Sequence, residues 1–265
     1  MSQERHGFVI VDTHCHAGTN WFEPVETLLF QMERNGVDKA VLVQFRGNYD
    51  SSYILDCTCK YPGRFAAVVL VDTKQPDALD KLEDWAGRGA VGVRLAPEEH
   101  SPGPDPLAVW RKASDLGLVV SSLGTLANFA SDGFRDVVSS LPNLEIVIEH
   151  LAGATPDMDY SLFERAMRLA QYPNTYIKLP GFGEVLPRPF PLPETTFGAP
   201  PRCVRMAYEA FGARRMMWGS DYPPSGSREG YANALRFPLE HIDFFTAQDR
   251  EWAFGQTALS VWRFA

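Results

Sequence analysis

Eight short apolar runs, rich in β-branched residues, recur along the chain at fairly even intervals. They are Phe8–Asp12, Lys39–Gln44, Phe65–Val71, Ala90–Leu95, Leu118–Leu123, Leu144–Glu149, Thr175–Leu179 and Met216–Trp218. Most of these runs lack the strict alternation of apolar and polar residues that is typical of a sheet with one face in water. They therefore predict strands buried on both faces, as in a parallel sheet covered by helices.

Segments with helical spacing lie between the predicted strands. In Glu23–Asn35 the apolar residues fall on one face, and Gly36 follows as a typical helix stop. Residues 180–201 depart from the pattern because they hold seven prolines, which predicts a long irregular loop of the kind that often serves as a lid. The other predicted helices are Pro76–Gly87, Asp105–Gly117, Ala127–Leu141, Asp159–Gln171, Arg202–Gly212, Glu229–Phe244 and Ala247–Phe264.

The alternation of strand and helix predicts an α/β fold with parallel strands. Eight such units in 265 residues fit a closed (β/α)8 TIM barrel that forms a single domain over residues 1–265. The alternative is an open, doubly wound sheet. That fold normally carries a glycine-rich phosphate loop after an early strand, whereas here the first run leads into Thr13-His14-Cys15-His16. The barrel is therefore the favoured architecture.

Composition excludes several classes of function. The chain carries 25 Lys and Arg against 33 Asp and Glu, a net charge of −8, and its cations are not clustered. Binding to nucleic acid or to an anionic membrane needs clustered cations, so we expect neither partner. No apolar stretch approaches the roughly 20 residues of a membrane span, and the N-terminus does not resemble a signal peptide. Four cysteines without paired spacing indicate reduced thiols, which predicts a cytoplasmic protein.

The most informative motif is Asp12-Thr13-His14-Cys15-His16, at the end of the first predicted strand. Because residues i and i+2 of a strand point to the same side, His14 and His16 direct two imidazoles toward one point. Imidazole is the commonest protein ligand for metal ions, so this pair is half of a metal site. The competing interpretation is one exposed and one core histidine that fall two residues apart by chance.

Two further ionisable residues follow later predicted strands. His150 comes directly after Leu144–Glu149, and Asp221 follows Met216–Trp218 after two small residues. Catalytic groups of TIM barrels lie at the carboxyl ends of the strands. Three imidazoles and one carboxylate form a sensible ligand set for zinc or a similar divalent ion, with a position left for water. The remaining histidines are interpreted as surface residues: His6, His100 and His241.

The order and spacing of these motifs resemble the amidohydrolase superfamily, in particular its branch of small barrels that includes sugar-lactone and dicarboxylate-lactone hydrolases. The similarity extends over nearly the whole chain. It rests on the strand-end His-x-His, Glu149-His150-Leu151-Ala152-Gly153, Gly219-Ser220-Asp221-Tyr222-Pro223 and Phe254-Gly255-Gln256-Thr257-Ala258-Leu259. The resemblance implies that the active-site residues are His14, His16, His150 and Asp221, with Asp221 also acting as the general base toward the attacking water.

Two positions depart from the superfamily pattern. Val119–Leu123 offers no bridging Lys or Glu, which argues against a two-metal site, and Thr175–Leu179 presents Lys178 where many members carry a second histidine. The expected cofactor is therefore one divalent ion, zinc or manganese, held weakly. Catalysis without a metal stays open, because some relatives in the lactonase branch resemble metal-free enzymes.

Cations near the strand ends are candidates for substrate binding. Arg94 and Lys178 lie in otherwise apolar strands, and Arg46 follows the second strand. A buried charge needs a partner, so Arg94 pairs either with a substrate carboxylate or ring oxygen, or with a barrel carboxylate such as Asp72 or Glu149. Aromatic residues at loop starts are candidates for an apolar wall or a substrate contact: Trp21, Phe22, Phe182, Phe190, Trp218 and Tyr222.

The reaction expected from this set is hydrolysis of a cyclic ester, with an anionic small molecule or a sugar lactone as the substrate. In that reaction Arg94 and Lys178 hold the substrate and offset the charge that develops on the tetrahedral oxygen. A metal-dependent decarboxylase of an aromatic or muconate-type acid is the alternative, and the missing second histidine disfavours it. A barrel that binds a ligand without turnover is a third interpretation. A homodimer stays open, because periodicity does not separate a core helix from an interface helix.

Overall fold

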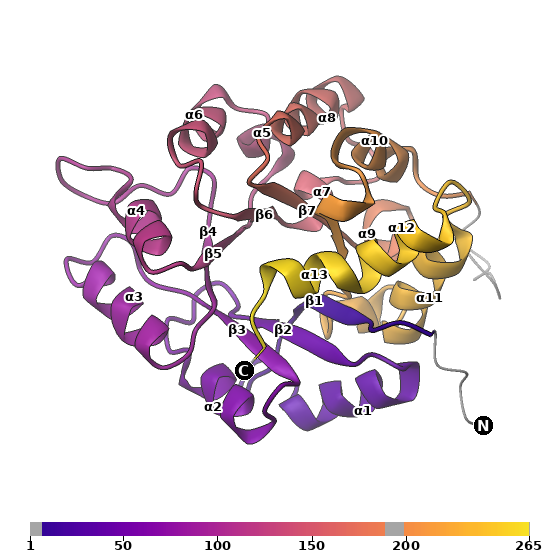
Figure 1. Ribbon diagram of the computed structural model, residues 1–265, viewed down its shortest axis with the longest axis horizontal. Helices are drawn as coiled ribbons and strands as arrows, with labels where there is room; N and C mark the ends of the chain where they lie inside the picture. Colours follow the sequence, from indigo (N-terminus) through magenta and orange to yellow (C-terminus); the bar gives the residue numbers. More distant parts are fainter. Residues whose placement is uncertain (1–6, 189–198, 265) are drawn as a thin grey trace.

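The computed structural model describes residues 7–188 and 199–264. Eight strands form one sheet, in which each strand pairs in parallel with the next along the chain (Figure 1). This topology confirms the predicted (β/α)8 barrel. The strands are β1 (Val11–Cys15), β2 (Lys39–Val43), β3 (Phe65–Val69), β4 (Gly92–Leu95), β5 (Val119–Ser122), β6 (Ile146–Ile148), β7 (Thr175–Leu179) and β8 (Met216–Trp218).

The barrel closes between β1 and the segment that follows β8. Cys15 forms a parallel bridge with Tyr222, and the amide of Asp221 donates to the carbonyl of His14 over 2.7 Å. In the same seam, where β1 meets the segment after β8, the Asp12 carboxylate accepts hydrogen bonds from the amide of Ser220 at 2.9 Å and from its hydroxyl at 2.6 Å. These bonds tie the segments that carry His14 and Asp221 directly to each other.

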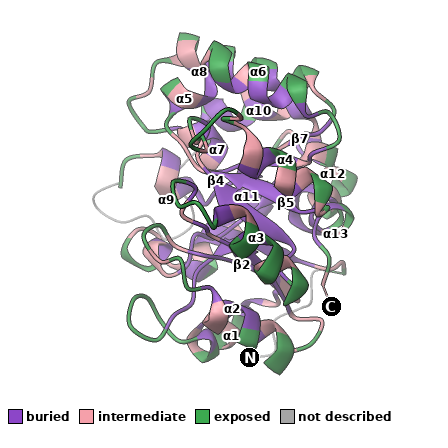
Figure 2. Cartoon of the chain, turned by 90° about the vertical axis from the view of Figure 1, so that its left-hand side faces the viewer, coloured by how far each residue is buried: buried purple, intermediate pink, exposed green. Residues whose placement is uncertain are grey.

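The helices surround the strands (Figure 1), and in Figure 2 the buried strands lie between helices whose outer faces are exposed. They are α1 (Val25–Asn35), α2 (Ser52–Lys60), α3 (Ala78–Gly87), α4 (Ala108–Asp115), α5 (Leu126–Phe129), α6 (Asp132–Ser140), α7 (His150–Gly153), α8 (Tyr160–Met167), α9 (Phe182–Val185), α10 (Arg202–Phe211), α11 (Tyr231–His241), α12 (Ala247–Glu251) and α13 (Thr257–Val261). Short 3-10 turns cover Arg168–Gln171, Ala213–Arg215 and Pro224–Ser227, and a π-helical turn covers Trp252–Gln256.

The apolar core has two parts. One cluster fills the barrel with valines of the strands and with Met217, and Trp262 from the C-terminal segment packs into it. The larger cluster fills the space between the sheet and the helices. No helix of the described residues combines the length and the apolar character needed to cross a bilayer.

The first strand lies three residues later than the sequence predicts, at Val11–Cys15 instead of Phe8–Asp12. The polar residues Asp12 and Thr13 do not end it, because their side chains bond across the seam. The Thr13 hydroxyl, for example, donates to the carbonyl of Trp218 over 2.7 Å. His14 is therefore inside the strand, and His16 is the first residue after it.

Three other regions differ from the prediction. Helix α2 was not predicted, and the predicted helix Ala127–Leu141 is two helices, because Ser131 caps a new one through the amide of Phe134. The predicted irregular loop 180–201 begins with the short helix α9. Residues 189–198, with Phe190, lie outside the described residues, as does His6. The predicted lid is therefore not tested.

Candidate active site at the carboxyl ends of the strands

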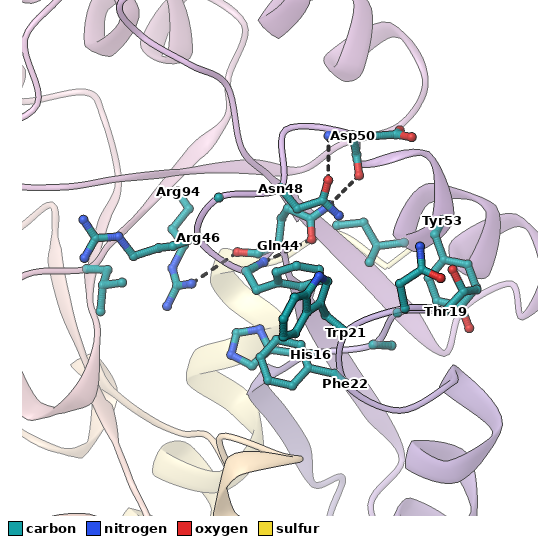
Figure 3. Close-up of a pocket in the computed structure, with 17 residues that line it drawn as sticks. His16, Thr19, Trp21, Phe22, Gln44, Arg46, Asn48, Asp50, Tyr53 and Arg94 are labelled. Carbon is teal, nitrogen blue, oxygen red and sulfur yellow. Dashed lines mark hydrogen bonds between the residues drawn. The ribbon is translucent and has the colours of Figure 1, made fainter.

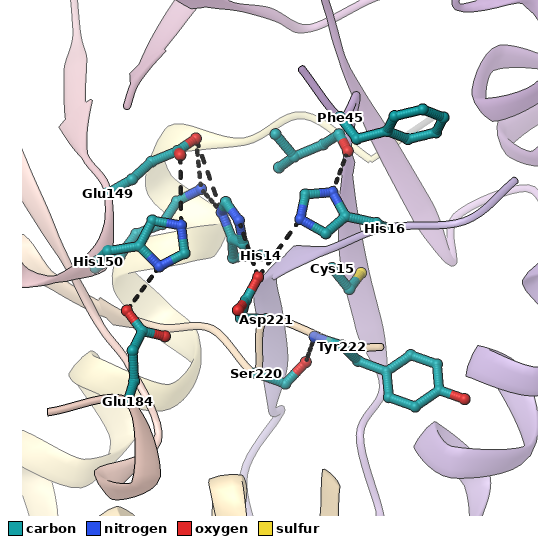
Figure 4. A network of polar contacts seen from close by, with 12 residues as sticks. His14, Cys15, His16, Phe45, Glu149, His150, Glu184, Ser220, Asp221 and Tyr222 are labelled. Atoms are coloured by element: carbon teal, nitrogen blue, oxygen red, sulfur yellow. Dashed lines mark hydrogen bonds and ion pairs between the residues drawn. The ribbon is translucent and has the colours of Figure 1, made fainter. Parts of the chain in front are cut away.

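His14 and His16 project to the same side of β1, as the alternation of a strand predicts, and both face Asp221 (Figure 4). The Oδ1 atom of Asp221 lies 3.7 Å from His14 Nε2 and 3.5 Å from His16 Nε2. His16 Nδ1 lies 2.7 Å from the carbonyl oxygen of Val43. That carbonyl accepts a hydrogen bond from Nδ1–H, so the lone pair of a neutral His16 is on the Nε2 atom that faces Asp221.

His150 reaches the same cluster through an unusual turn. His150, Leu151 and Ala152 have φ values of 50°, 50° and 60°, a left-handed conformation that L-residues rarely adopt. This turn follows β6 directly and brings the ring of His150 to 4.6 Å from the ring of His14, centroid to centroid. Backbone strain of this kind concentrates at functional sites, where the surrounding structure holds it in place.

Glu184 of α9 holds His150 from the other side, with Oε1 2.7 Å from His150 Nδ1. Nδ1 therefore donates to the carboxylate, and Nε2 faces the cluster. Burial lowers the pKa of His150, but the charge and hydrogen bond of Glu184, together with the charges of Asp221 and Glu149, raise it more, so the pKa lies above its usual value. Sequence reasoning missed Glu184, because it lies in the proline-rich segment that was expected to be irregular.

Arg228 fixes Asp221. Its Nη1 atom donates to Asp221 Oδ2 over 2.9 Å, and its Nη2 atom lies 3.5 Å from Glu184 Oε2. Burial raises the pKa of Asp221, but the nearby imidazole of His16 and the charges of His150 and Arg228 lower it below its usual range. Asp221 is therefore a carboxylate at neutral pH. Nothing in the sequence singled out Arg228, which lies in a loop without periodicity.

Arg94 and Lys178 both face a buried carboxylate, Glu149. Arg94 Nη2 and Nε lie 2.7 and 3.2 Å from Glu149 Oε2, which is one of the two kinds of partner left open for Arg94. Lys178 Nζ lies 2.8 Å from His14 Nδ1 and 2.9 Å from the Ser121 hydroxyl, which donates to Glu149 Oε1. Burial raises the pKa of Glu149, but Arg94 and Lys178 lower it well below its usual range. Arg94, Lys178 and Glu149 thus form a buried network of charged groups next to the imidazole of His14.

A cavity of about 890 Å³ opens beside the cluster, and its wall includes His16 and Arg94 (Figure 3). Arg46, Trp21 and Phe22 line it as well. The other predicted substrate residues, Lys178 and Tyr222, are buried and are not part of this wall, and Phe182 and Trp218 are core residues with no exposed surface. Four predicted substrate-contact residues therefore line the cavity, namely Arg94, Arg46, Trp21 and Phe22, and two, Phe182 and Trp218, lie in the core.

The family model of the amidohydrolases matches residues 11–264, which is nearly the whole chain. The chain belongs to the amidohydrolase family. The 4-sulfomuconolactone hydrolase of Hydrogenophaga intermedia is 28% identical over 81% of this chain and 69% of its own. The L-fucono-1,5-lactonase of Burkholderia ambifaria is 28% identical over 88% of this chain and 82% of its own. Both are lactone hydrolases by name, as the resemblance implies.

The fold of this amidohydrolase also matches solved structures. An amidohydrolase of Burkholderia multivorans with bound zinc superimposes with a TM-score of 0.76 at 17% identity, over 96% of this chain and 98% of that chain. At this identity the match shows the shared barrel and no more.

The ligand atoms of this amidohydrolase suit a divalent ion at one position in particular. His14, His16 and Asp221 each offer one atom within 4.8 Å of the others, and His14 Nε2 is buried without a hydrogen-bond partner in the described residues. His150 belongs to two neighbouring groups, one with His14 and Glu149 and one with Glu184 and Asp221. His14, His16, His150 and Asp221 therefore each belong to at least one group of three possible metal ligands, and these groups share members.

Lys178 sets a condition on this metal site. An ion on His14 Nε2 requires the ring proton to be on Nδ1, which must then donate to a neutral Lys178 amine. Burial lowers the pKa of Lys178 to about 8, so the neutral amine is accessible near neutral pH. Burial and the charge of Lys178 lower the pKa of His14 well below its usual value, which keeps the imidazole uncharged. The donor set therefore fits a metal ion.

Proposed function

We propose that this amidohydrolase is a lactonase, which opens a cyclic ester by attack of water. The observation that carries the proposal is the convergence of the Asp221 carboxylate with the imidazoles of His14 and His16 at one buried point. The two lactone hydrolases among its relatives support the same reaction.

Asp221 is the general base of this proposal. Arg228 binds its Oδ2 atom, and Oδ1, which faces the imidazoles, accepts the proton of the attacking water through one of its lone pairs. After the tetrahedral intermediate collapses, the protonated Asp221 returns this proton to the leaving alkoxide. One residue thus moves the proton from the water to the alcohol, and ring opening needs no second acid.

His14, His16 and Asp221 are the residues that would hold one divalent ion. Imidazole nitrogens with a carboxylate suit zinc, and manganese is the alternative. When bound, such an ion polarises the carbonyl and lowers the pKa of a bound water toward ~7. Without an ion, the same carboxylate would remain the base.

His150 is placed to stabilise the oxygen that gains charge. Glu184 accepts from Nδ1 and raises the pKa of the ring, so a protonated His150 directs its Nε2–H toward the cluster. A preorganised donor in a dry site lowers the barrier because it meets the developing oxyanion without reorganisation. Lys178 and Arg94 act behind the imidazoles, because their hydrogen bonds go to His14, Ser121, Glu149 and the Gln44 carbonyl. Arg46, exposed on the cavity wall, is left to bind a substrate anion.

The test is ring opening of a panel of aldonolactones and muconolactone-type acids by the purified protein, with and without added zinc or manganese. Asp221→Asn should abolish turnover while the far-ultraviolet circular dichroism stays unchanged. Asp136→Asn, in an exposed position of α6, is the matched control and should retain full activity. Release of CO2 instead of ring opening would assign the protein to the decarboxylases and contradict the proposal.

A further inference from the structure

The cavity beside His16 is larger than one small lactone ring requires. Its volume is about 890 Å³. Cavities of this size hold drug-sized ligands. From His16 and Arg94 the wall continues along the loops that follow β1 and β2, through Trp21 and Asn48 (Figure 3). The cavity therefore has room for a part of the substrate that takes no part in the reaction.

Exposed aromatic side chains are concentrated at this cavity. In residues 7–188 and 199–264, the strongly exposed large apolar side chains are Trp21 (73%), Phe30 (58%), Tyr49 (47%) and Phe22 (41%). Trp21 and Phe22 line the cavity, and Tyr49 lies between two lining residues, Asn48 and Asp50. Only Phe30, on α1, is elsewhere. Such a grouping marks a binding surface, whereas single exposed apolar residues need no explanation.

The loop after β1 is built to present these rings to the site. Phe22 has a φ of 65°, which L-residues rarely adopt, and its ring stacks on that of His16 at 5.1 Å with 17° between the planes. Phe45 supports Phe22 edge-on at 5.0 Å. The loop folds back so closely that a Cβ atom at Gly18 would lie 2.4 Å from the carbonyl oxygen of Trp21. The flat face that results is continuous with the imidazole of the candidate active site.

Several polar groups of the loop after β2 form hydrogen bonds within that loop. The Gln44 side chain donates to the carbonyl of Asp50 at 2.7 Å and accepts from the amide of Phe45 at 3.0 Å. The Asn48 side chain accepts from the amide of Asp50, whose carboxylate in turn accepts from the amide of Ser52. The hydrogen-bonding atoms named here are therefore engaged within the protein. What this side of the wall presents to a ligand is the Arg46 guanidinium together with aromatic faces.

We propose that this cavity binds a planar aromatic group, so that the substrate is an aryl-fused or aryl-substituted lactone. The aromatic group lies against Trp21 and Phe22, and the lactone carbonyl lies next to His16. Aromatic rings prefer such stacked or edge-on arrangements, and their contact adds to the burial of apolar surface. This inference rests on the proposed lactonase function, and it makes Trp21 and Phe22 specificity-determining residues.

The test compares two lactones with the same six-membered ring, the aryl-fused 3,4-dihydrocoumarin and the plain δ-valerolactone. We expect Trp21→Ala and Phe22→Leu each to lower kcat/KM for dihydrocoumarin about threefold to tenfold, mainly through KM, as expected for one lost aromatic contact. For δ-valerolactone, which lacks the aromatic ring, kcat/KM should fall clearly less than for dihydrocoumarin. Phe30→Ala removes an exposed aromatic ring outside the cavity and is the matched control.

The possible outcomes distinguish a failure of the aryl-lactone proposal from a failure of the lactonase function. Turnover of both lactones with equal losses in the variants, or a preference of the unchanged protein for a sugar lactone such as δ-gluconolactone, overturns the aryl proposal and leaves the lactonase function in place. An equal loss together with a changed elution volume of Trp21→Ala in size-exclusion chromatography overturns it in favour of an interface between two copies. Absence of turnover for every lactone contradicts the lactonase function itself.

Discussion

Replacement of Glu184 tests how the site prepares His150. The Glu184 carboxylate accepts from His150 Nδ1 over 2.7 Å, and both side chains are largely buried. A hydrogen bond to a charged group contributes about 1.5–3 kcal/mol, roughly twice the neutral value. Glu184→Gln keeps an acceptor oxygen but loses the charge, about 1 kcal/mol, which corresponds to about fivefold in kcat. Glu184→Ala loses the whole bond and should lower kcat about 10- to 150-fold.

The assay is the steady-state rate of lactone opening, followed with a pH indicator. Because Glu184 does not line the cavity, KM should change little while kcat falls. Glu164→Gln, exposed on α8, is the matched control. A Glu184→Ala variant with the kcat of the unchanged protein would refute the role assigned to His150.

The same substitution has a defined effect on stability. Glu184 raises the pKa of His150 above the value of 6.5 that is usual for histidine, so the native state binds the proton more tightly than the unfolded chain. This stabilisation is fully present below pH 6.5 and is lost as the pH rises through the raised native pKa. Glu184→Gln should therefore lower the free energy of unfolding more at pH 5 than at pH 9.

Three other predictions concern the buried charges and the ion. Arg94→Met leaves the Glu149 carboxylate buried with less compensation and should lower the free energy of unfolding in urea by about 3–5 kcal/mol, whereas Arg111→Met, exposed on α4, should change it little. Burial raises the pKa of Glu229 from 4.5 to about 7, so native stability falls by up to about 3 kcal/mol as the pH rises between these values; Glu229→Gln should abolish this fall. Zinc binding, measured by competition with a chromophoric chelator, should tighten about tenfold or more between pH 6.5 and 8.5. The reason is that a zinc ligand at His14 Nε2 needs Nδ1–H to donate a hydrogen bond to a neutral Lys178 amine, and the pKa of Lys178 is about 8. A pH-independent affinity would contradict His14 as a ligand.

The parts of the site that follow from periodicity were predictable from the sequence. Buried apolar runs identified eight strands, and the carboxyl ends of barrel strands are one surface, so His14, His16, His150 and Asp221 were expected to meet. Their side chains do converge. The register of the first strand was less accurate, because polar Asp12 and Thr13 are satisfied by bonds across the barrel seam that sequence periodicity does not reveal.

The parts that depend on irregular segments were not predictable. Glu184 lies in a helix of only four residues, too short to show a period in the sequence, and Arg228 lies in an irregular loop, yet they hold His150 and Asp221. Arg94 could be assigned two kinds of partner from the sequence, and only the strand register brings it to Glu149. Lys178 was expected to hold substrate because it is a cation in an apolar strand, whereas its Nζ atom contacts His14 and Ser121.

The most direct test of the lactonase site is hydrolysis in oxygen-18 water, followed by mass spectrometry of the product. If Asp221 activates water for attack on the carbonyl, the opened hydroxy acid gains one labelled oxygen in its carboxylate and no CO2 is released, and Asp221→Asn forms no product above the uncatalysed rate. Loss of CO2 from the substrate, or equal labelled product from Asp221→Asn, would contradict this account.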